Sequence, residues 1–135
     1  MSKDIQIIEV PSEIGAGTRG ASLGIEAIKV AARNKSSKLF SDYNSVSVKE
    51  ENEYLDEDQQ NPHGKYIKGI FKVASRLSTT VKEKLKEGNF PIILSGDHSM
   101  AHASISGIKA AYPKKRIGVV WIDAHADLHS PFTSP

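Results

Sequence analysis

The sequence contains no cysteine, and this absence excludes several kinds of chemistry. Disulfide frameworks, thiolate zinc sites, iron–sulfur clusters and cysteine nucleophiles all require the thiol that the chain lacks. The chain also lacks an apolar run long enough to cross a bilayer, and its start, MSKDIQIIEV, does not resemble a signal peptide. We therefore expect a cytoplasmic protein with no membrane partner, whose chemistry uses oxygen and nitrogen side chains.

A strong net charge is missing as well. The chain has 18 Lys and Arg against 16 Asp and Glu, which gives a formal charge of +2. Acidic residues gather in 50–58 and basic residues in 82–86 and 114–116, so the charges do not form one basic stripe. We expect no nucleic-acid partner. With 135 residues and 39% hydrophobic content, the chain suits one domain with its own core.

Four short apolar segments predict β-strands. Residues 5–10 and 90–94 are β-branched or apolar runs that are too short for helices. A weaker strand is predicted around Val46 and Val48. The run 117–122, IGVVWI, is apolar on both faces, which is typical of a central parallel strand.

Helices are predicted between these strands, and their order indicates the fold. Apolar residues at helical spacing predict helices over 22–33, 65–87 and 99–112. The polar, acidic segment 49–64 is predicted to be an exposed loop. This alternation predicts an α/β fold, an open and mainly parallel sheet in three layers with helices on both faces. Ligands of such sheets gather beyond the carboxyl ends of the strands.

Polar residues at alternate positions follow the last predicted strand: Asp123, His125, Asp127 and His129. An extended backbone would present all four on one side. Two carboxylates crowded at the end of a buried strand repel each other and lose hydration, and a bound cation resolves both problems. Taken singly, each residue also fits a turn cap, a core histidine or a solvated carboxylate. The alternating set favours metal ligands.

A further imidazole lies in the sequence GDHS, directly after the strand at 90–94. A lone histidine near a helix start is more often structural, but the position of His98 at the same sheet edge lets it reach the cluster. His102, four residues later, is expected to support its neighbours or to pack. Carboxylate and imidazole ligands without sulfur favour manganese, iron, zinc or magnesium. The number of ligands indicates two ions, although it falls short of a complete two-metal site.

Longer stretches around these residues resemble a known family. SGDHSMAHASISG (95–107) and WIDAHADLHSPFTSP (121–135) resemble the arginase family of ureohydrolases, and TRGASLGIEAIKVA (18–31) is similar to that family's opening loop and helix. The similarity covers essentially the whole chain. It identifies residues 1–135 as the N-terminal portion of a single arginase-like α/β domain, incomplete in this chain.

The resemblance implies hydrolysis of a guanidinium-type carbon by a hydroxide that bridges two manganese ions (Mn²⁺). By motif position, His98 and Asp127 would bind one ion, His125 would bind the other, and Asp123 would bridge both. Asp127 would also be the catalytic acceptor of a hydrogen bond from the hydroxide. Asp127 and His129 would contact the substrate. Arginases usually carry Asn at the position of His129, which leaves the amino-acid end of the substrate open.

Within the family, the stretch after DAHAD most resembles arginases, which implies conversion of L-arginine to L-ornithine and urea. The expected partner is a small guanidino substrate, and the complete protein is expected to be a homo-oligomer. Formimidoylglutamase and agmatinase are alternatives, because most substrate contacts of the family lie downstream of these residues. The alternative from a different class is a truncated, non-catalytic fragment that holds metal weakly or serves as an interaction module.

Overall fold

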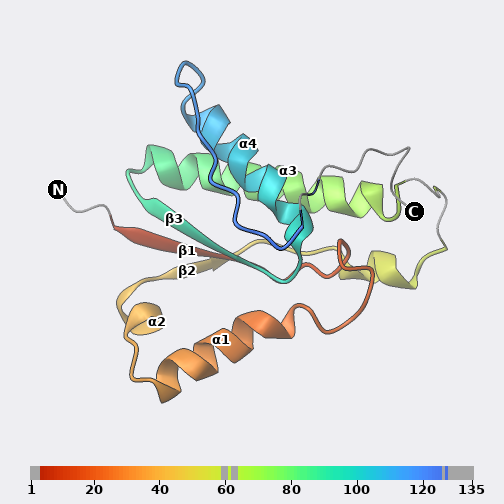
Figure 1. Cartoon of the computed structure of the whole chain (residues 1–135), viewed down its shortest axis with the longest axis horizontal. Coiled ribbons are helices and arrows are strands. Elements are labelled where there is room, and N and C mark those ends of the chain that lie inside the picture. The colour runs from red at the N-terminus through yellow and green to blue at the C-terminus, as the bar shows by residue number, and fades with distance from the viewer. Residues whose placement is uncertain (1–3, 59–60, 62–63, 126, 128–135) are drawn as a thin grey trace.

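The computed structural model describes residues 4–58, 61, 64–125 and 127 (Figure 1). Helices and strands alternate along the chain as the sequence predicts. In order they are β1 (Ile5–Val10), α1 (Leu23–Asn34), α2 (Leu39–Asp42), β2 (Ser45–Ser47), the 3₁₀ helix η1 (Asn52–Asp56), α3 (Ile67–Lys86), β3 (Phe90–Ser95), the 3₁₀ helix η2 (His98–Met100) and α4 (Ala101–Ala111).

The strands form a parallel sheet in the order β2-β1-β3. Ile7 of β1 lies opposite Ser45 on one side and Ile92 on the other, so β1 is the central strand. Ile7 and Ile8 are fully buried, as the apolar run predicts. Val48 lies just beyond β2 and donates its N–H to the Glu9 carbonyl at 2.8 Å, which extends the pairing. The predicted strands at 5–10 and 90–94 are confirmed.

Helices cover both faces of the sheet: α3 and α4 lie on one side and α1 on the other (Figure 1). The apolar stripe of α3 places Val73, Leu77 and Val81 in the core. Gly107 lets α4 approach α3 closely, because a Cβ there would stand 2.8 Å from the Cβ of Val81. The predicted open α/β architecture is thus confirmed. No helix in the described part of the chain is long and apolar enough to cross a membrane.

The strand predicted at 117–122 is absent from the structure. Within the described residues this segment has no strand partner, and the side chains of Val120 and Ile122 are 88% and 92% exposed. A strand that is apolar on both faces needs neighbouring strands for its hydrogen bonds and a covering layer on each side. The described chain supplies neither, so the prediction is wrong here.

The prediction of an exposed loop over 49–64 is also wrong in part. The described residues of this segment include η1, and Glu51 is buried. Its carboxylate accepts hydrogen bonds from Lys72, at 3.2 Å, and from Arg76, both on α3. Two cationic partners offset the loss of hydration of a buried carboxylate, which is why an acidic residue can anchor this segment.

Candidate metal centre

The turn that carries His98 is anchored in the core on both sides. It leaves the carboxyl end of β3, and Asp97 begins η2 by accepting a hydrogen bond from the Ser99 N–H at 2.9 Å. Met100, the last residue of η2, is almost completely buried. The side chain of His98 itself is 54% exposed. The turn therefore presents an imidazole to solvent from a fixed base, at the sheet edge where ligands of parallel sheets bind.

The segment after α4 brings two carboxylates to this imidazole. In Figure 1 the segment runs back along α4 toward the end of β3. Asp123 Oδ2 lies 3.5 Å from His98 Nδ1, and Asp127 Oδ2 lies 3.3 Å from His98 Nε2. Each of the three residues offers one ligand atom, and these atoms all lie within 4.8 Å of one another. We call His98, Asp123 and Asp127 the metal cluster.

The backbone that carries the two carboxylates is turned, whereas the sequence predicts an extended one. Asp127 has a φ of +53°, in the left-handed region, which Asp tolerates better than most residues. Alternation along an extended chain therefore does not explain how Asp123 and Asp127 meet, and that expectation is wrong. The turn brings both carboxylates to His98.

The other predicted site residues are placed differently. His125 Nδ1 lies 3.4 Å from Asp123 Oδ1, but the His125 side chain is 85% exposed and lies outside the metal cluster. His129 lies outside the described residues. His102 is exposed on α4, which does not fit the predicted role in packing.

Trp121 contacts the metal cluster, and sequence reasoning missed it. Its indole N–H donates to Asp127 Oδ2 at 3.0 Å, and its ring meets the His98 ring edge to face, with centroids 5.2 Å apart. An indole N–H normally finds a hydrogen-bond partner, and carboxylates follow Trp121 closely in the sequence. The need of the indole N–H for an acceptor was the sequence signal that could have identified Trp121 as part of the site. As the only tryptophan of the chain, Trp121 is also a fluorescent reporter of this site.

The electrostatics of the cluster suit a bound cation. The backbone N–H of His125, 2.8 Å from Asp123 Oδ1, lowers the pKa of Asp123, and the nearby His98 and His125 side chains lower it further. Asp123 is therefore a carboxylate at neutral pH. Two carboxylates and an imidazole without sulfur are a donor set that fits divalent ions such as Mn²⁺, Zn²⁺ and Mg²⁺.

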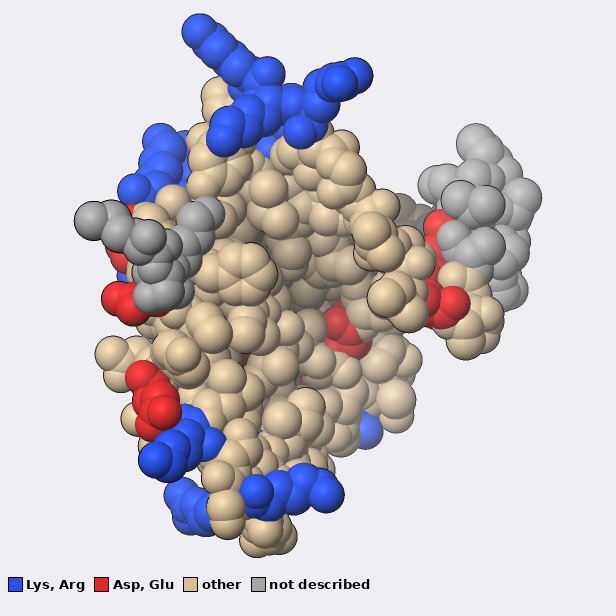
Figure 2. Space-filling model, turned by 60° about the vertical axis from the view of Figure 1, so that its left-hand side comes forward, with Lys and Arg blue, Asp and Glu red and all other residues tan. Residues whose placement is uncertain are grey.

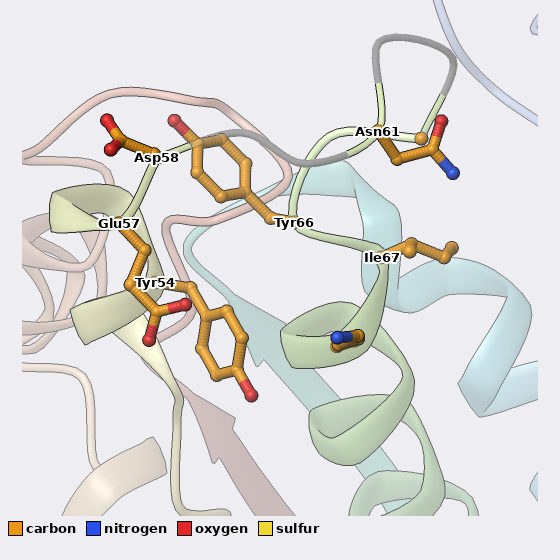
Figure 3. A pocket seen from close by; sticks show the side chains of 8 residues that line it. Tyr54, Glu57, Asp58, Asn61, Tyr66 and Ile67 are labelled. Carbon is orange, nitrogen blue, oxygen red and sulfur yellow. The ribbon is translucent and has the colours of Figure 1, made fainter.

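A separate pocket of about 170 Å³ opens between η1 and the start of α3 (Figure 3). The rings of Tyr54 and Tyr66 and the carboxylates of Glu57 and Asp58 line part of it. None of the three cluster residues lines this pocket. The metal cluster, where the predicted ligands meet, is therefore the candidate site.

Basic side chains on the face shown in Figure 2 form separate groups at its upper and lower ends. The upper group lies where Figure 1 places the turn after α4, and Lys114, Lys115 and Arg116 are exposed in that turn. This face therefore carries no continuous basic surface.

The fold and the metal cluster define a class, an open parallel α/β protein with imidazole and carboxylate groups beyond the carboxyl ends of its strands. Comparison with known proteins defines the family. The family model of the arginase family matches residues 3–135, and the chain belongs to that family.

Relatives of known structure and function agree with this assignment. The arginase of Brevibacillus brevis is 32% identical over 139 residues, covering 100% of this chain and 45% of that protein. The structure of Bacillus caldovelox arginase matches with a TM-score of 0.79 at 30% identity, over 99% of this chain and 45% of that chain. Entamoeba histolytica arginase, solved in complex with L-ornithine, matches with a TM-score of 0.81 at 25% identity, over 98% of this chain and 45% of that chain. This chain thus spans less than half the length of these relatives.

Proposed function

We propose that these residues are the metal-binding N-terminal portion of a single arginase-like domain that converts L-arginine to L-ornithine and urea. The observation that carries this proposal is the meeting of His98, Asp123 and Asp127 in a chain of the arginase family. The arginase relatives and the ornithine held by the Entamoeba histolytica enzyme support arginine as the substrate. The complete protein would act as a cytoplasmic homo-oligomer.

The oxygen and nitrogen donors of these residues would form part of a site for two manganese ions as cofactors. His98 and Asp127 would hold one ion, His125 would hold the second, and Asp123 would contribute to both. Divalent ions in such a site supply a Lewis acid and make water nucleophilic near neutral pH. The exposure of His125 leaves its imidazole accessible to an ion.

The side chains of the cluster would orient the reacting groups. Trp121 donates to one oxygen of Asp127 and so restricts the rotation of this carboxylate. Asp127 would accept a hydrogen bond from the attacking water, and Asp127 and His129 would contact the substrate. The water oxygen would bond to the guanidinium carbon and become the carbonyl oxygen of urea, the bond from that carbon to the side-chain nitrogen would break, and both protons lost by the water would end on this nitrogen. Urea and the amine product leave.

A specific observation favours a second function for the 135 residues by themselves, that of a non-catalytic metal-binding or interaction fragment. Val120 and Ile122 are exposed immediately before Asp123, and the chain spans 45% of the Brevibacillus brevis arginase. An apolar segment without a strand partner is a poor support for metal ligands. We therefore expect the isolated chain to bind Mn²⁺ weakly and to lack turnover.

Titration of the chain with Mn²⁺, followed by Trp121 fluorescence and calorimetry, tests the metal site. We expect quenching in the wild type and a loss of affinity of about tenfold or more in His98→Asn. His102→Asn is the matched control, because this exposed histidine lies one helical turn away. Equal binding by both variants would contradict the assignment of His98. Two tight sites per chain would contradict the non-catalytic fragment.

Activity is tested in a full-length protein that contains these residues. We expect Mn²⁺-dependent release of urea from L-arginine, with no turnover in Asp123→Asn and unchanged turnover in Asp42→Asn, a change on the exposed surface of α2. Agmatine and formimidoylglutamate are assayed in parallel to separate the alternative substrates. Urea release that persists after complete chelation of metal would rule out the proposed function.

A further inference from the structure

We propose that Asp97 is a positioning residue. Its buried carboxylate joins the turn that carries His98 to the loop after β1, and thereby sets where the His98 imidazole stands. The inference rests on the proposed function only in taking His98 as a metal ligand. Asp97 is buried while its neighbour His98 is exposed, so the two residues point into different surroundings.

Asp97 is held by four hydrogen-bond donors. Oδ2 accepts from Ser12 Oγ at 2.8 Å and from the Gly15 N–H at 3.1 Å, both in the loop after β1. Oδ1 accepts from the Ser99 N–H at 2.9 Å and from the Ser99 hydroxyl, both in the His98 turn. A carboxylate accepts at both oxygens, whereas an amide would turn its NH₂ group toward donors on one side. The chemistry of this position therefore specifies Asp rather than Asn.

The two segments that Asp97 joins are packed without spare room. A Cβ on Gly15 would stand 2.5 Å from the Cβ of Ser99, and a Cβ on Gly96 would stand 3.1 Å from the backbone nitrogen of Ser22. The Gly96 N–H also donates to the Val10 carbonyl at 3.0 Å, continuing the pairing of β1 with β3. A shift of the turn would therefore require the loop after β1 to move with it.

This anchoring matters because the partners of His98 are less well supported. Asp123 and Asp127 lie in a segment that forms no strand among the described residues, while His98 stands between the buried Asp97 and the buried Met100. The turn is thus the rigid half of the metal cluster. Loosening it would spread the imidazole over several positions and weaken metal binding.

The test compares two buried carboxylates in the 135-residue chain. Asp97→Asn is expected to weaken Mn²⁺ binding about 10- to 100-fold, measured by Trp121 fluorescence and by electron paramagnetic resonance of free Mn²⁺. Glu51→Gln is the control, because Glu51 is also a buried, hydrogen-bonded carboxylate but pairs with Lys72 and Arg76 of α3. The control is expected to lower the melting temperature and to leave the affinity unchanged. Equal affinity in Asp97→Asn and wild type would overturn the proposal.

A readout without metal separates this proposal from the proposed function. In NMR spectra of the metal-free chain, we expect the contact between the His98 and Trp121 rings to weaken in Asp97→Asn and to persist in Glu51→Gln. If the wild-type chain binds no Mn²⁺, the assignment of a metal site to these residues fails, and the ring contact by itself tests the role of Asp97. An unchanged ring contact in Asp97→Asn would overturn that role.

Gly15→Ala provides a second variant that leaves Asp97 intact. The added methyl group meets Ser99 and the Asp97 carboxylate from the side of the loop after β1. The same loss of Mn²⁺ affinity and of the ring contact is expected, and wild-type values of both in the folded variant would contradict the proposal. Should Asp97→Asn fail to fold, Gly15→Ala decides the question.

Discussion

The two segments that form the metal cluster differ in how the fold supports them. The His98 turn continues β3, which pairs with β1 along its whole length, and is anchored by Asp97 and Met100. The segment 117–127 follows α4 without strand pairing among its described residues, and Ile122 beside Asp123 is almost fully exposed. One half of the cluster is thus built into the core, and the other half is held by contacts with the first.

This difference shows what 135 residues of an arginase-family chain can organise by themselves. The pairing of β1 with β3 and the packing of α3 against the sheet suffice to place one imidazole. The segment with both carboxylates is apolar enough for a central strand, but a central strand needs neighbours on both sides. The chain spans less than half the length of its relatives, and its described residues contain no such neighbours for 117–122.

The largest expected effect is a loss of folding stability when the core that supports the His98 turn is disrupted. Leu77→Ala removes a fully buried side chain of α3 and is expected to lower the free energy of unfolding by about 2 to 5 kcal/mol. Ile122→Ala is the matched control and should change it by less than about 0.5 kcal/mol, because this side chain is exposed. Denaturant unfolding followed by far-ultraviolet circular dichroism measures both. Equal losses of unfolding free energy in the two variants would show that the side chain of Ile122 is packed in solution.

A smaller effect is expected in segment 117–127, which carries Asp123 and Asp127 and has little support from the fold. Mn²⁺ at about 100 times its dissociation constant should stabilise the bound arrangement by about 2.7 kcal/mol, since under the proposed function the ion would join Asp123 and Asp127 to His98. Amide hydrogen exchange should therefore slow in 117–127 and change little in β1 and β3. Ca²⁺ at the same concentration serves as a control for nonspecific ionic effects. If Mn²⁺ slowed amide hydrogen exchange only in β1 and β3, the idea that 117–127 is the less supported segment would be contradicted.

The smallest effect is the loss of folding stability at acidic pH through Glu51, which pairs with α3 in the core-supported part of the chain. Arg76 and Lys72 lower the pKa of Glu51, so the folded chain binds this proton more weakly than the unfolded chain does. The stabilisation is present above about pH 4.5, the ordinary value, and is lost as the pH falls through the lowered pKa. Glu51→Gln should therefore melt at a lower temperature at neutral pH and lose less stability on acidification.

Melting temperatures between about pH 3 and about pH 7 measure this response. Glu83→Gln, at an exposed position of the same helix α3, is the control and should follow the wild type. Glu13, whose pKa is lowered by hydrogen bonds from Ser22, contributes acid sensitivity of the same sign, so Glu51→Gln should remove only part of it. Identical pH profiles for Glu51→Gln and wild type would contradict the role of Glu51.

Local patterns predicted the supported half of the molecule well. The β-branched run at 5–10 is β1, the helical stripe in 65–87 is α3, and the run at 90–94 is β3, each within two residues of its predicted bounds. Periodicity suffices there because each element buries its apolar face against a neighbour within the same chain. For 117–122 the same reasoning fails, because the apolar pattern specifies a strand but not its partners.

The candidate site was predictable in its chemistry and not in its contacts. The residue types of His98, Asp123 and Asp127 indicate metal ligands, and their three donor atoms do come together. The hydrogen bonds that Ser12 and Gly15 donate to Asp97 could not be predicted, since they join residues from different loops. The bond from the Trp121 indole N–H to Asp127 spans six positions, and its only sequence signal was that a tryptophan N–H needs an acceptor. Ser12 and Asp97 are 85 positions apart, and no local pattern connects them.

The sequence by itself determined the α/β class, the three strands β1, β2 and β3, the helices α1, α3 and α4, and the kinds of donor atom at the sheet edge. These follow from hydrophobic periodicity and side-chain chemistry, which act over a few residues. Only the tertiary structure decided that Asp97 would hold the His98 turn in place while Val120 and Ile122 stayed exposed. Buried polar groups must find donors wherever the fold places them, and an apolar strand must find partners beyond its own residues.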